Sequence, residues 1–252
     1  MDYSWRKEKF DSEVLGFRVA KILNIKSRGS SEQLRTRIKN LIGELTEKKI
    51  DYASIRSEST NYPLAHALEE NGFILVDGLI TLSLEVSDLR FEKPDERIRA
   101  AIPRDVHDLK KITKGLYSTS RIFNDPLIPK DRANKFYIKW IENSVLGKAA
   151  DSVLVWKEDK ILGYVTLQKK GAAQRGSARG GQIPLLGVSE QARGKGIAKK
   201  LLNAALRKFK SWGVRQVVIE TQMDNIPALR TYQSVGFKIM DSHFTFRWSN
   251  SP

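Results

Sequence analysis

The chain has 252 residues, a net charge of +15, no cysteine and only His66, His107 and His243 as histidines. This length allows two modest domains, and the composition excludes disulfides, thiol nucleophiles and thiolate metal sites, while the histidines lack metal-ligand spacing, so no metal is expected. No apolar run has membrane-spanning length and the first residues lack the apolar core of a signal peptide, so we expect a cytoplasmic protein without membrane contact.

The first predicted elements recur in the same order near the C-terminus. An amphipathic stretch and a strand candidate precede Asn61, and Gly72 follows that residue by 11 positions; the same offset separates Asn225 from Gly236. In both copies a proline stands two residues after the asparagine and a phenylalanine follows the glycine. This repeat predicts a degenerate copy of a half-fold in front of a complete one.

The first copy lacks the residue types that would bind a coenzyme and donate a proton. Residues 26–31 contain no paired glycines, and Leu68 stands where the second copy has Tyr232. We therefore predict a structural N-terminal half at 1–92 and a catalytic domain at 93–252, joined by a polar linker near 92–97.

The excess charge lies in the predicted catalytic domain. Residues 1–92 carry 14 basic and 15 acidic side chains, whereas residues 93–252 carry 30 and 14. A small phosphorylated ligand accounts for such a basic half, so nucleic acid is not an expected partner.

The middle of the chain alternates strands and helices, as α/β proteins do. In chain order the expected elements are a strand at 98–102, a helix at 105–116, an irregular stretch at 120–126, a helix at 132–145, and a hairpin of 152–156 with 161–168. The following segment, 171–182, contains Arg175 and Arg179 among glycines and is longer than a hairpin loop requires.

The most informative stretch follows a strand-like run at 183–188. The segment Gln191-Ala192-Arg193-Gly194-Lys195-Gly196-Ile197-Ala198 joins this strand to an amphipathic helix ending at Gly213. Glycines allow positive φ and bring backbone N–H groups close to an anion, and a helix N-terminus adds positive charge. The spacing is neither a Walker loop nor a dinucleotide fingerprint, but it predicts a phosphate cradle.

The last elements are a buried strand at 214–221, a helix capped by Asn225 and a closing strand through Phe246. This order of elements resembles the signature half of the Gcn5-related N-acetyltransferase (GNAT) superfamily. The order is a strand, the glycine loop, a helix, a second strand and an Asn-capped helix that carries Tyr232. The resemblance implies a mixed α/β (α+β) acyltransferase fold that binds acetyl-CoA.

The resemblance also implies roles for individual residues. It makes Tyr232 the general acid, Asn225 a coenzyme contact, and a backbone N–H near Leu186 to Val188 the oxyanion donor. The coenzyme-binding residues it implies are Leu186, Val188, Gln191, Ala192, Arg193, Gly194, Lys195, Gly196, Ile197, Ala198 and Asn225. No general base is assigned, because a strand-end carboxylate such as Glu220 is usually solvated or ion-paired.

Further residues resemble the dTDP-fucosamine acetyltransferase family over nearly the whole chain. They are Ser120-Arg121, the aromatic run from Phe136 to Trp140, and Thr221-Gln222-Met223 before Asn225. The resemblance implies acetylation of the amino group of a nucleotide-linked 4-amino-4,6-dideoxyhexose. Arg121, Phe123 and Tyr137 are the candidate substrate contacts, although Tyr137 also suits ordinary helix packing.

Two other functions remain open at this point. One is an enzyme that acetylates a protein N-terminus or lysine, and the other is a noncatalytic module that binds acetyl-CoA or RNA. A homodimer is possible. The identity of the sugar, the nucleotide and the acyl chain is left undecided.

Overall fold

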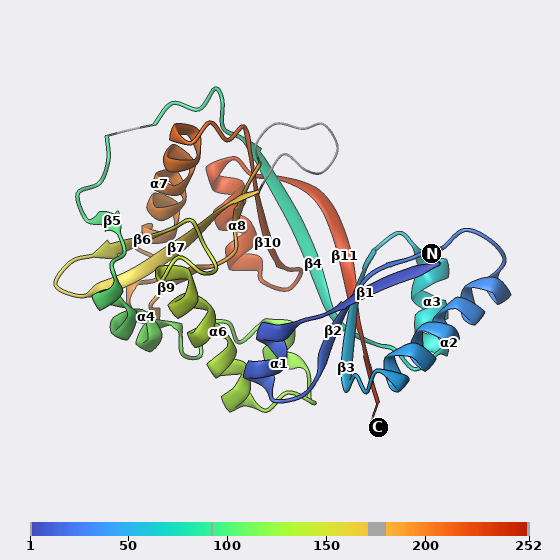
Figure 1. The fold of residues 1–252 in the computed structure, drawn as a ribbon. Helices are drawn as coiled ribbons and strands as arrows, with labels where there is room; N and C mark the ends of the chain where they lie inside the picture. The colour runs from blue at the N-terminus through green and yellow to red at the C-terminus, as the bar shows by residue number, and fades with distance from the viewer. Residues whose placement is uncertain (1, 92, 171–179, 251–252) are drawn as a thin grey trace. The chain divides into compact units, whose positions relative to one another are not determined.

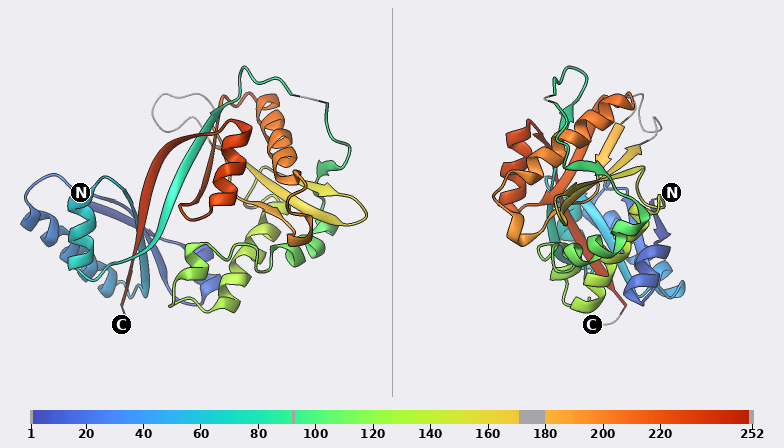
Figure 2. Two further views of the ribbon diagram at one scale, coloured as in Figure 1. Left: turned by 180° about the vertical axis from the view of Figure 1, so that it is seen from behind. Right: turned by 90° about the vertical axis from the view of Figure 1, so that its left-hand side faces the viewer.

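The computed structural model describes residues 2–91, 93–170 and 180–250, which form two compact units (Figures 1 and 2). The first unit comprises Met1–Leu79, Ser120–Ala133 and Asp241–Pro252, and the second comprises Ile80–Thr119 and Asn134–Met240. This division by contacts differs from a single boundary at residue 92, because two later segments return to the first unit. The roles of the two ranges stay predictions: a structural role for 1–92 and a catalytic role for 93–252.

The first unit is a sheet with one apolar and one polar face. Its strands run in the order β1-β2-β3-β11, and helices α2 and α3 pack against each other over the apolar face, where Ile22, Ile55 and Phe246 are buried. Its elements are β1 (Tyr3–Lys7), α1 (Lys9–Leu15), β2 (Val19–Ile25), α2 (Ser31–Glu47), β3 (Tyr52–Glu58), α3 (Tyr62–Glu70), α5 (Arg121–Asn124) and the later part of β11 (Lys238–Ser249).

The second unit holds the glycine loop. Its strands run in the order β4-β10-β8-β7-β6-β5, with β9 also paired to β7, and α7 packs on β6, β7, β9 and α8. Its elements are β4 (Ile74–Glu85, from Ile80), β5 (Ile98–Ala100), α4 (Val106–Thr113), most of α6 (Lys130–Val145), β6 (Ser152–Lys157), β7 (Ile161–Lys170), β8 (Gly180–Ile183), β9 (Leu186–Val188), α7 (Ile197–Ser211), β10 (Gln216–Gln222) and α8 (Ile226–Val235), with 3-10 turns at Pro103–Asp105 and Glu190–Ala192.

The two predicted copies share their local chemistry. Asn61 caps α3 with φ −86° and ψ 64°, and Asn225 caps α8 with φ −81° and ψ 63°; each side chain accepts a hydrogen bond from the amide three residues later. The copies also exchange their last strands, since β4 follows α3 in the chain but neighbours β10, while β11 follows α8 but pairs with β3. This reciprocity is what an internal repeat would produce, although the degenerate half itself stays a prediction.

The run 183–188 is two strands instead of the single strand expected from the sequence. Gln168 pairs with Gln182 and Val165 with Leu186, so two residues of β7 oppose three residues of the other strand. This β-bulge lies at Pro184, which has no N–H to give to the ladder. The bulge separates β8 from β9 and sets the direction of the β9 amides.

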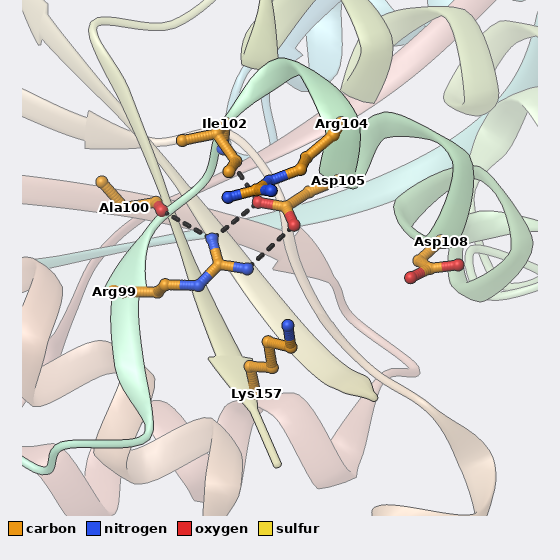
Figure 3. A pocket seen from close by; sticks show the side chains of 7 residues that line it. All are labelled: Arg99, Ala100, Ile102, Arg104, Asp105, Asp108 and Lys157. Carbon is orange, nitrogen blue, oxygen red and sulfur yellow. Dashed lines mark hydrogen bonds and ion pairs between the residues drawn. The ribbon is translucent and has the colours of Figure 1, made fainter. Parts of the chain in front are cut away.

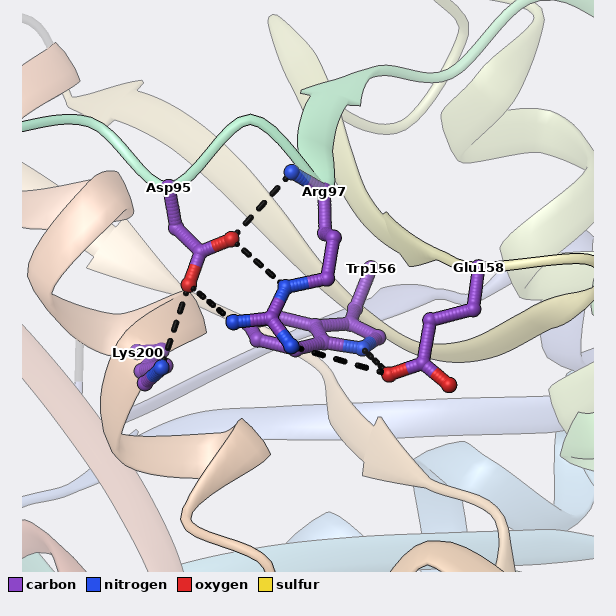
Figure 4. A network of polar contacts seen from close by, with 5 residues as sticks. All are labelled: Asp95, Arg97, Trp156, Glu158 and Lys200. Carbon is purple, nitrogen blue, oxygen red and sulfur yellow. Dashed lines mark hydrogen bonds and ion pairs between the residues drawn. The ribbon is translucent and has the colours of Figure 1, made fainter.

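The predicted linker is tied down by polar contacts (Figure 4). The Arg97 guanidinium lies 4.2 Å from the centroid of the Trp156 ring, and Asp95 bonds to Arg97 at 2.8 Å and to Lys200 at 3.1 Å. The Arg97 hydrogen bonds, followed by the Lys200 bond, hold the pKa of Asp95 well below its usual range. Lys200, which lies on α7 close to the glycine loop, is therefore engaged with the linker.

Candidate active site

The glycine loop has the backbone geometry of an anion cradle. Gly194 has φ 76° and Gly196 has φ 73°, and a Cβ added at either would meet no atom within 4 Å. Gly196 is the N-cap of α7 and provides no side-chain cap. The first amides of an α-helix have no intrahelical acceptor, so they are available to an anion at this open surface.

Two buried residues anchor this exposed loop. Ala192 is 1% and Ile197 3% exposed, and both pack in the core of the second unit. Between them the loop residues are exposed, Gln191 before them is also exposed, and Ala198 after them is half-buried; the exposed loop residues are Arg193, Gly194, Lys195 and Gly196. The exposed residues of the loop are therefore held in place by two buried ones, and contact of the predicted residues with the coenzyme stays a prediction.

The β9 strand presents two amides away from its partner. The Ser189 amide donates to the Leu162 carbonyl of β7, and the Thr166 amide of β7 donates to the Leu185 carbonyl. Because such donors alternate along an antiparallel strand, the N–H groups of Leu186 and Val188 point away from β7. β10 pairs with β8 only as far as Ile219 opposite Ile183, so within the described residues no strand covers this edge of β9.

Tyr232 lies on α8 with its ring packed in the core of the same unit. The residue is 7% exposed, and among the described residues its hydroxyl makes no hydrogen bond. Burial raises its pKa well above the usual value. The ring is held in the core while the hydroxyl has no partner within the described part of the protein, so this phenol is suited to give its proton to a bound molecule.

Other tyrosines of this unit form a hydrogen-bonded network that the sequence did not reveal, and its member Tyr117 also interacts electrostatically with Tyr232. The Tyr164 hydroxyl bonds to Thr113 Oγ1 at 2.8 Å and to the Tyr117 hydroxyl at 3.0 Å, and Tyr117 stacks on Tyr137 at 4.4 Å. Burial raises the pKa of Tyr164 to about 12. Tyr164 lies opposite Gly187 on β9, where an added Cβ would come within 3.0 Å of the ring. The cluster thus supports β9 from one side.

The Asn225 side chain is used within the protein. Its Oδ1 accepts from the Ala228 amide at 3.3 Å, and its Nδ2 donates to Thr221 Oγ1 at 3.1 Å. The side-chain amide has one further hydrogen for a ligand. The cap explains why the sequence places asparagine here, and a coenzyme contact stays a prediction.

Sequence analysis did not select Ser189. Its Oγ is buried directly after β9, and no hydrogen-bond partner for it exists among the described residues. An unsatisfied buried hydroxyl between β9 and the glycine loop is a candidate ligand contact. Nothing in the sequence distinguishes Ser189 from an ordinary helix cap.

The candidate substrate residues belong to different units. Arg121 and the buried Phe123 lie on α5 in the first unit, and Tyr137 lies on α6 in the second. The Tyr137 ring also stacks on Trp140 with centroids 6.1 Å apart. Ring packing therefore accounts for Tyr137, and substrate contact by these three residues stays a prediction.

A cavity of about 410 Å³ in the second unit contains none of the predicted residues (Figure 3). In its lining, Arg99 donates two hydrogen bonds to Asp105 at 2.7 and 2.8 Å. The lining residues are Arg99, Ala100, Ile102, Arg104, Asp105, Asp108 and Lys157. In the described ranges no cluster of three or more His, Cys, Asp or Glu side chains could hold a metal ion, and no helix is both long and apolar enough to span a bilayer.

Comparison with known proteins agrees with this geometry. Residues 116–237 match the acetyltransferase (GNAT) family. The spore coat polysaccharide biosynthesis protein SpsD of Bacillus subtilis (strain 168) is 23% identical over 90% of this chain and 77% of its own length. The dTDP-fucosamine acetyltransferase of Escherichia coli O6:H1 is 29% identical over 69% of this chain and 70% of its own. A GCN5-related N-acetyltransferase structure from Sphaerobacter thermophilus has a TM-score of 0.66 and 16% identity, covering 100% of this chain and 78% of that one.

The residues that carry the family match include both the glycine cradle at the N-terminus of α7 and the β9 edge with its free amides. Residues 116–237 belong to the GNAT acetyltransferase family, and the protein is an acetyl-CoA-dependent N-acetyltransferase.

Proposed function

We propose that this enzyme transfers the acetyl group of acetyl-CoA to the amino group of a nucleotide-linked amino-deoxy sugar, of the dTDP-4-amino-4,6-dideoxyhexose type. Two relatives support this acceptor, since both are named for sugar or polysaccharide biosynthesis and each alignment covers more than two thirds of both proteins. The observation that carries the chemistry is the buried residue Tyr232, whose hydroxyl has no hydrogen-bond partner in the described part of the chain.

The chain's own residues divide the work of the reaction. Bound acetyl-CoA supplies a thioester carbonyl, whose bond to sulfur breaks as the sugar nitrogen bonds to carbon. The Gly194 and Gly196 amides and the α7 N-terminus hold the pyrophosphate, and the Leu186 and Val188 amides face the developing oxyanion. Tyr232 gives its proton to the leaving sulfur, and the amine loses its own proton to water.

A screen of acceptors tests this proposal. Acetyl-CoA is offered with dTDP-, UDP- and GDP-linked amino sugars, and with peptides bearing a free N-terminus or lysine, while thiol release is followed. We expect turnover with an amino-sugar nucleotide to exceed turnover with every peptide. Faster acetylation of a peptide would contradict the proposed acceptor.

The pH dependence of turnover should carry the signature of Tyr232. Burial raises the pKa of this phenol, so it keeps its proton to higher pH than an exposed tyrosine. We expect no loss of kcat from this group between pH 7 and pH 9.5 at saturating substrates, because the acidic form is lost only above about pH 10. A kcat profile that falls with a midpoint near pH 8.5 would argue for another acid.

One coenzyme should bind per chain. The N-terminus of α2, the counterpart of α7, is closed by its own capping box, in which Ser30 Oγ accepts from Gln33 N at 3.2 Å and Gln33 Oε1 accepts from Ser30 N at 3.0 Å. These bonds occupy amides that α7 leaves open. Calorimetric titration with acetyl-CoA should give a stoichiometry of one, and two equivalent sites would refute this interpretation of the repeat.

A further inference from the structure

Tyr117 lies in the loop after α4, and within the described residues its hydroxyl makes a single hydrogen bond, to the Tyr164 hydroxyl at 3.0 Å. Its ring stacks on Tyr137 with centroids 4.4 Å apart, and the loop is tied to α6 because Gly115 N donates to Asn134 Oδ1 at 2.8 Å. The half-buried Tyr117 is therefore held in place, while part of the bonding capacity of its hydroxyl is unused.

The helices α4 and α7 cover opposite faces of β7 (Figure 1). Tyr164 of β7 bonds to Thr113 of α4, whereas its neighbour Val165 packs in the core that α7 helps to form. Tyr117 is joined to Tyr164 and so belongs to the α4 face. Tyr232 packs in the same core as Val165 and so belongs to the α7 face.

Strand β9 lies between these two faces of the second unit. Gly187 faces α4, because a Cβ added there would clash with Leu116, the residue before Tyr117. The side chains of Leu186 and Val188 point the other way and pack against the core of the α7 face. The β9 edge with the two proposed oxyanion amides therefore has one tyrosine on each face of the sheet.

The Tyr117 phenol keeps its proton at neutral pH. Burial raises its pKa well above the usual value, and the neighbouring Tyr164, Tyr137 and Tyr232 raise it further. The contribution of Tyr232 also shows that the two phenols lie within electrostatic range of each other. Because Tyr117 stays protonated, it does not serve as a base, and its oxygen remains a hydrogen-bond acceptor.

An amine that attacks a thioester must point its lone pair at the carbonyl carbon. A hydroxyl that donated a hydrogen bond to the nitrogen would occupy this lone pair, whereas a hydroxyl that accepts from an N–H group leaves it free. Tyr117 meets this requirement when its O–H donates to Tyr164 and the Tyr164 O–H donates to Thr113, because the Tyr117 oxygen then keeps both lone pairs.

We infer that the Tyr117 hydroxyl accepts a hydrogen bond from the amino group of the acceptor and so directs its nitrogen toward the acetyl carbonyl. Two tyrosines then serve the two ends of the transfer, since Tyr117 orients the nitrogen from the α4 face and Tyr232 protonates the sulfur from the α7 face. The amine still loses its proton to water. The inference rests on the proposed roles of Tyr232 and the β9 amides, but it does not depend on the identity of the sugar.

An N-methyl acceptor tests this contact in the full-length protein. The probes are the fastest acceptor in the screen of amino-sugar nucleotides and peptides, and its N-methyl derivative. A neutral primary amine has one N–H for Tyr117 and one to lose to water, whereas a secondary amine has a single N–H. We expect the parent to prefer the primary amine by about tenfold or more in kcat/KM. Tyr117→Phe should slow the primary amine about tenfold and the N-methyl acceptor less than about threefold, as loss of one hydrogen bond does.

Tyr164→Phe is the matched control for this experiment. It removes the same hydrogen bond from the other side and keeps the Tyr117 hydroxyl. We expect its preference for the primary amine to stay within about threefold of the parent. Calorimetry should show acetyl-CoA affinity within about twofold of the parent in both variants.

The outcomes separate this contact from the proposed acceptor. If Tyr117→Phe slows both acceptors equally, or if Tyr164→Phe removes the preference as fully, Tyr117 only supports the loop and the inference is wrong. A parent without preference for the primary amine would also overturn it, and this result needs no variant. A preference that Tyr117→Phe removes with a peptide as the fastest acceptor would support the contact and overturn the amino-sugar acceptor.

Discussion

Tyr232→Phe should lower turnover by about a hundredfold or more with the best amino-sugar nucleotide, while acetyl-CoA affinity stays within about twofold, because general acid catalysis is typically worth that much. The change removes one hydroxyl and keeps the ring. That hydroxyl makes no hydrogen bond within the described chain, so its loss should cost little stability. An effect on kcat without an effect on binding would locate the hydroxyl in the transition state.

Tyr164→Phe is the matched control. It removes another buried phenol hydroxyl from the same unit, but this hydroxyl is already bonded to Thr113 and Tyr117. We expect lower stability and kcat within a few fold of the parent. If Tyr232→Phe retains at least half of the parent kcat, or if Tyr164→Phe shows the larger loss, the assignment of the acid is wrong.

The sequence predicted those features of the site that depend on local chemistry. Gly194 and Gly196 were informative because their positive φ strongly favours glycine, and Asn225 because a side chain that caps a helix acts within a few residues. The same logic exposed the repeated cap at Asn61. Each of these signals is contained in a window of a dozen residues.

Features that depend on pairing between distant strands could not be predicted. Pro184 was a local sign of the bulge, yet the amide directions in β9 follow from its register against β7. Thr245 and Arg247 join Lys21 on one face only because β11 pairs with β3 instead of with its own repeat. No periodicity along the chain records that exchange, so the shared face of these residues could not be recognised from sequence.

The largest effect on binding is expected for Gly194→Val and Gly196→Val, which should abolish detectable acetyl-CoA binding in calorimetry. A branched residue at these positive φ angles is strained by about 1–2 kcal/mol, and its side chain would project into the open space above the cradle, where nothing lies within 4 Å. The strain moves the amides of the loop, and the added side chain blocks the space for the pyrophosphate.

Gly147→Val distinguishes blocking from strain. Gly147 has φ 72°, and it too has no atom within 4 Å of an added Cβ, but it lies in a turn after α6 outside the cradle. All three variants should lose similar stability in thermal melts, while only the two loop variants lose acetyl-CoA. If Gly147→Val and a folded Gly194→Val bind acetyl-CoA with equal affinity, the loop only connects the strand to the helix and does not bind the coenzyme. Weakened binding by Gly147→Val would mean that backbone strain acts on the site from a distance. Because the backbone strain is matched, the difference in acetyl-CoA affinity between the variants measures the contribution of the phosphate cradle to binding.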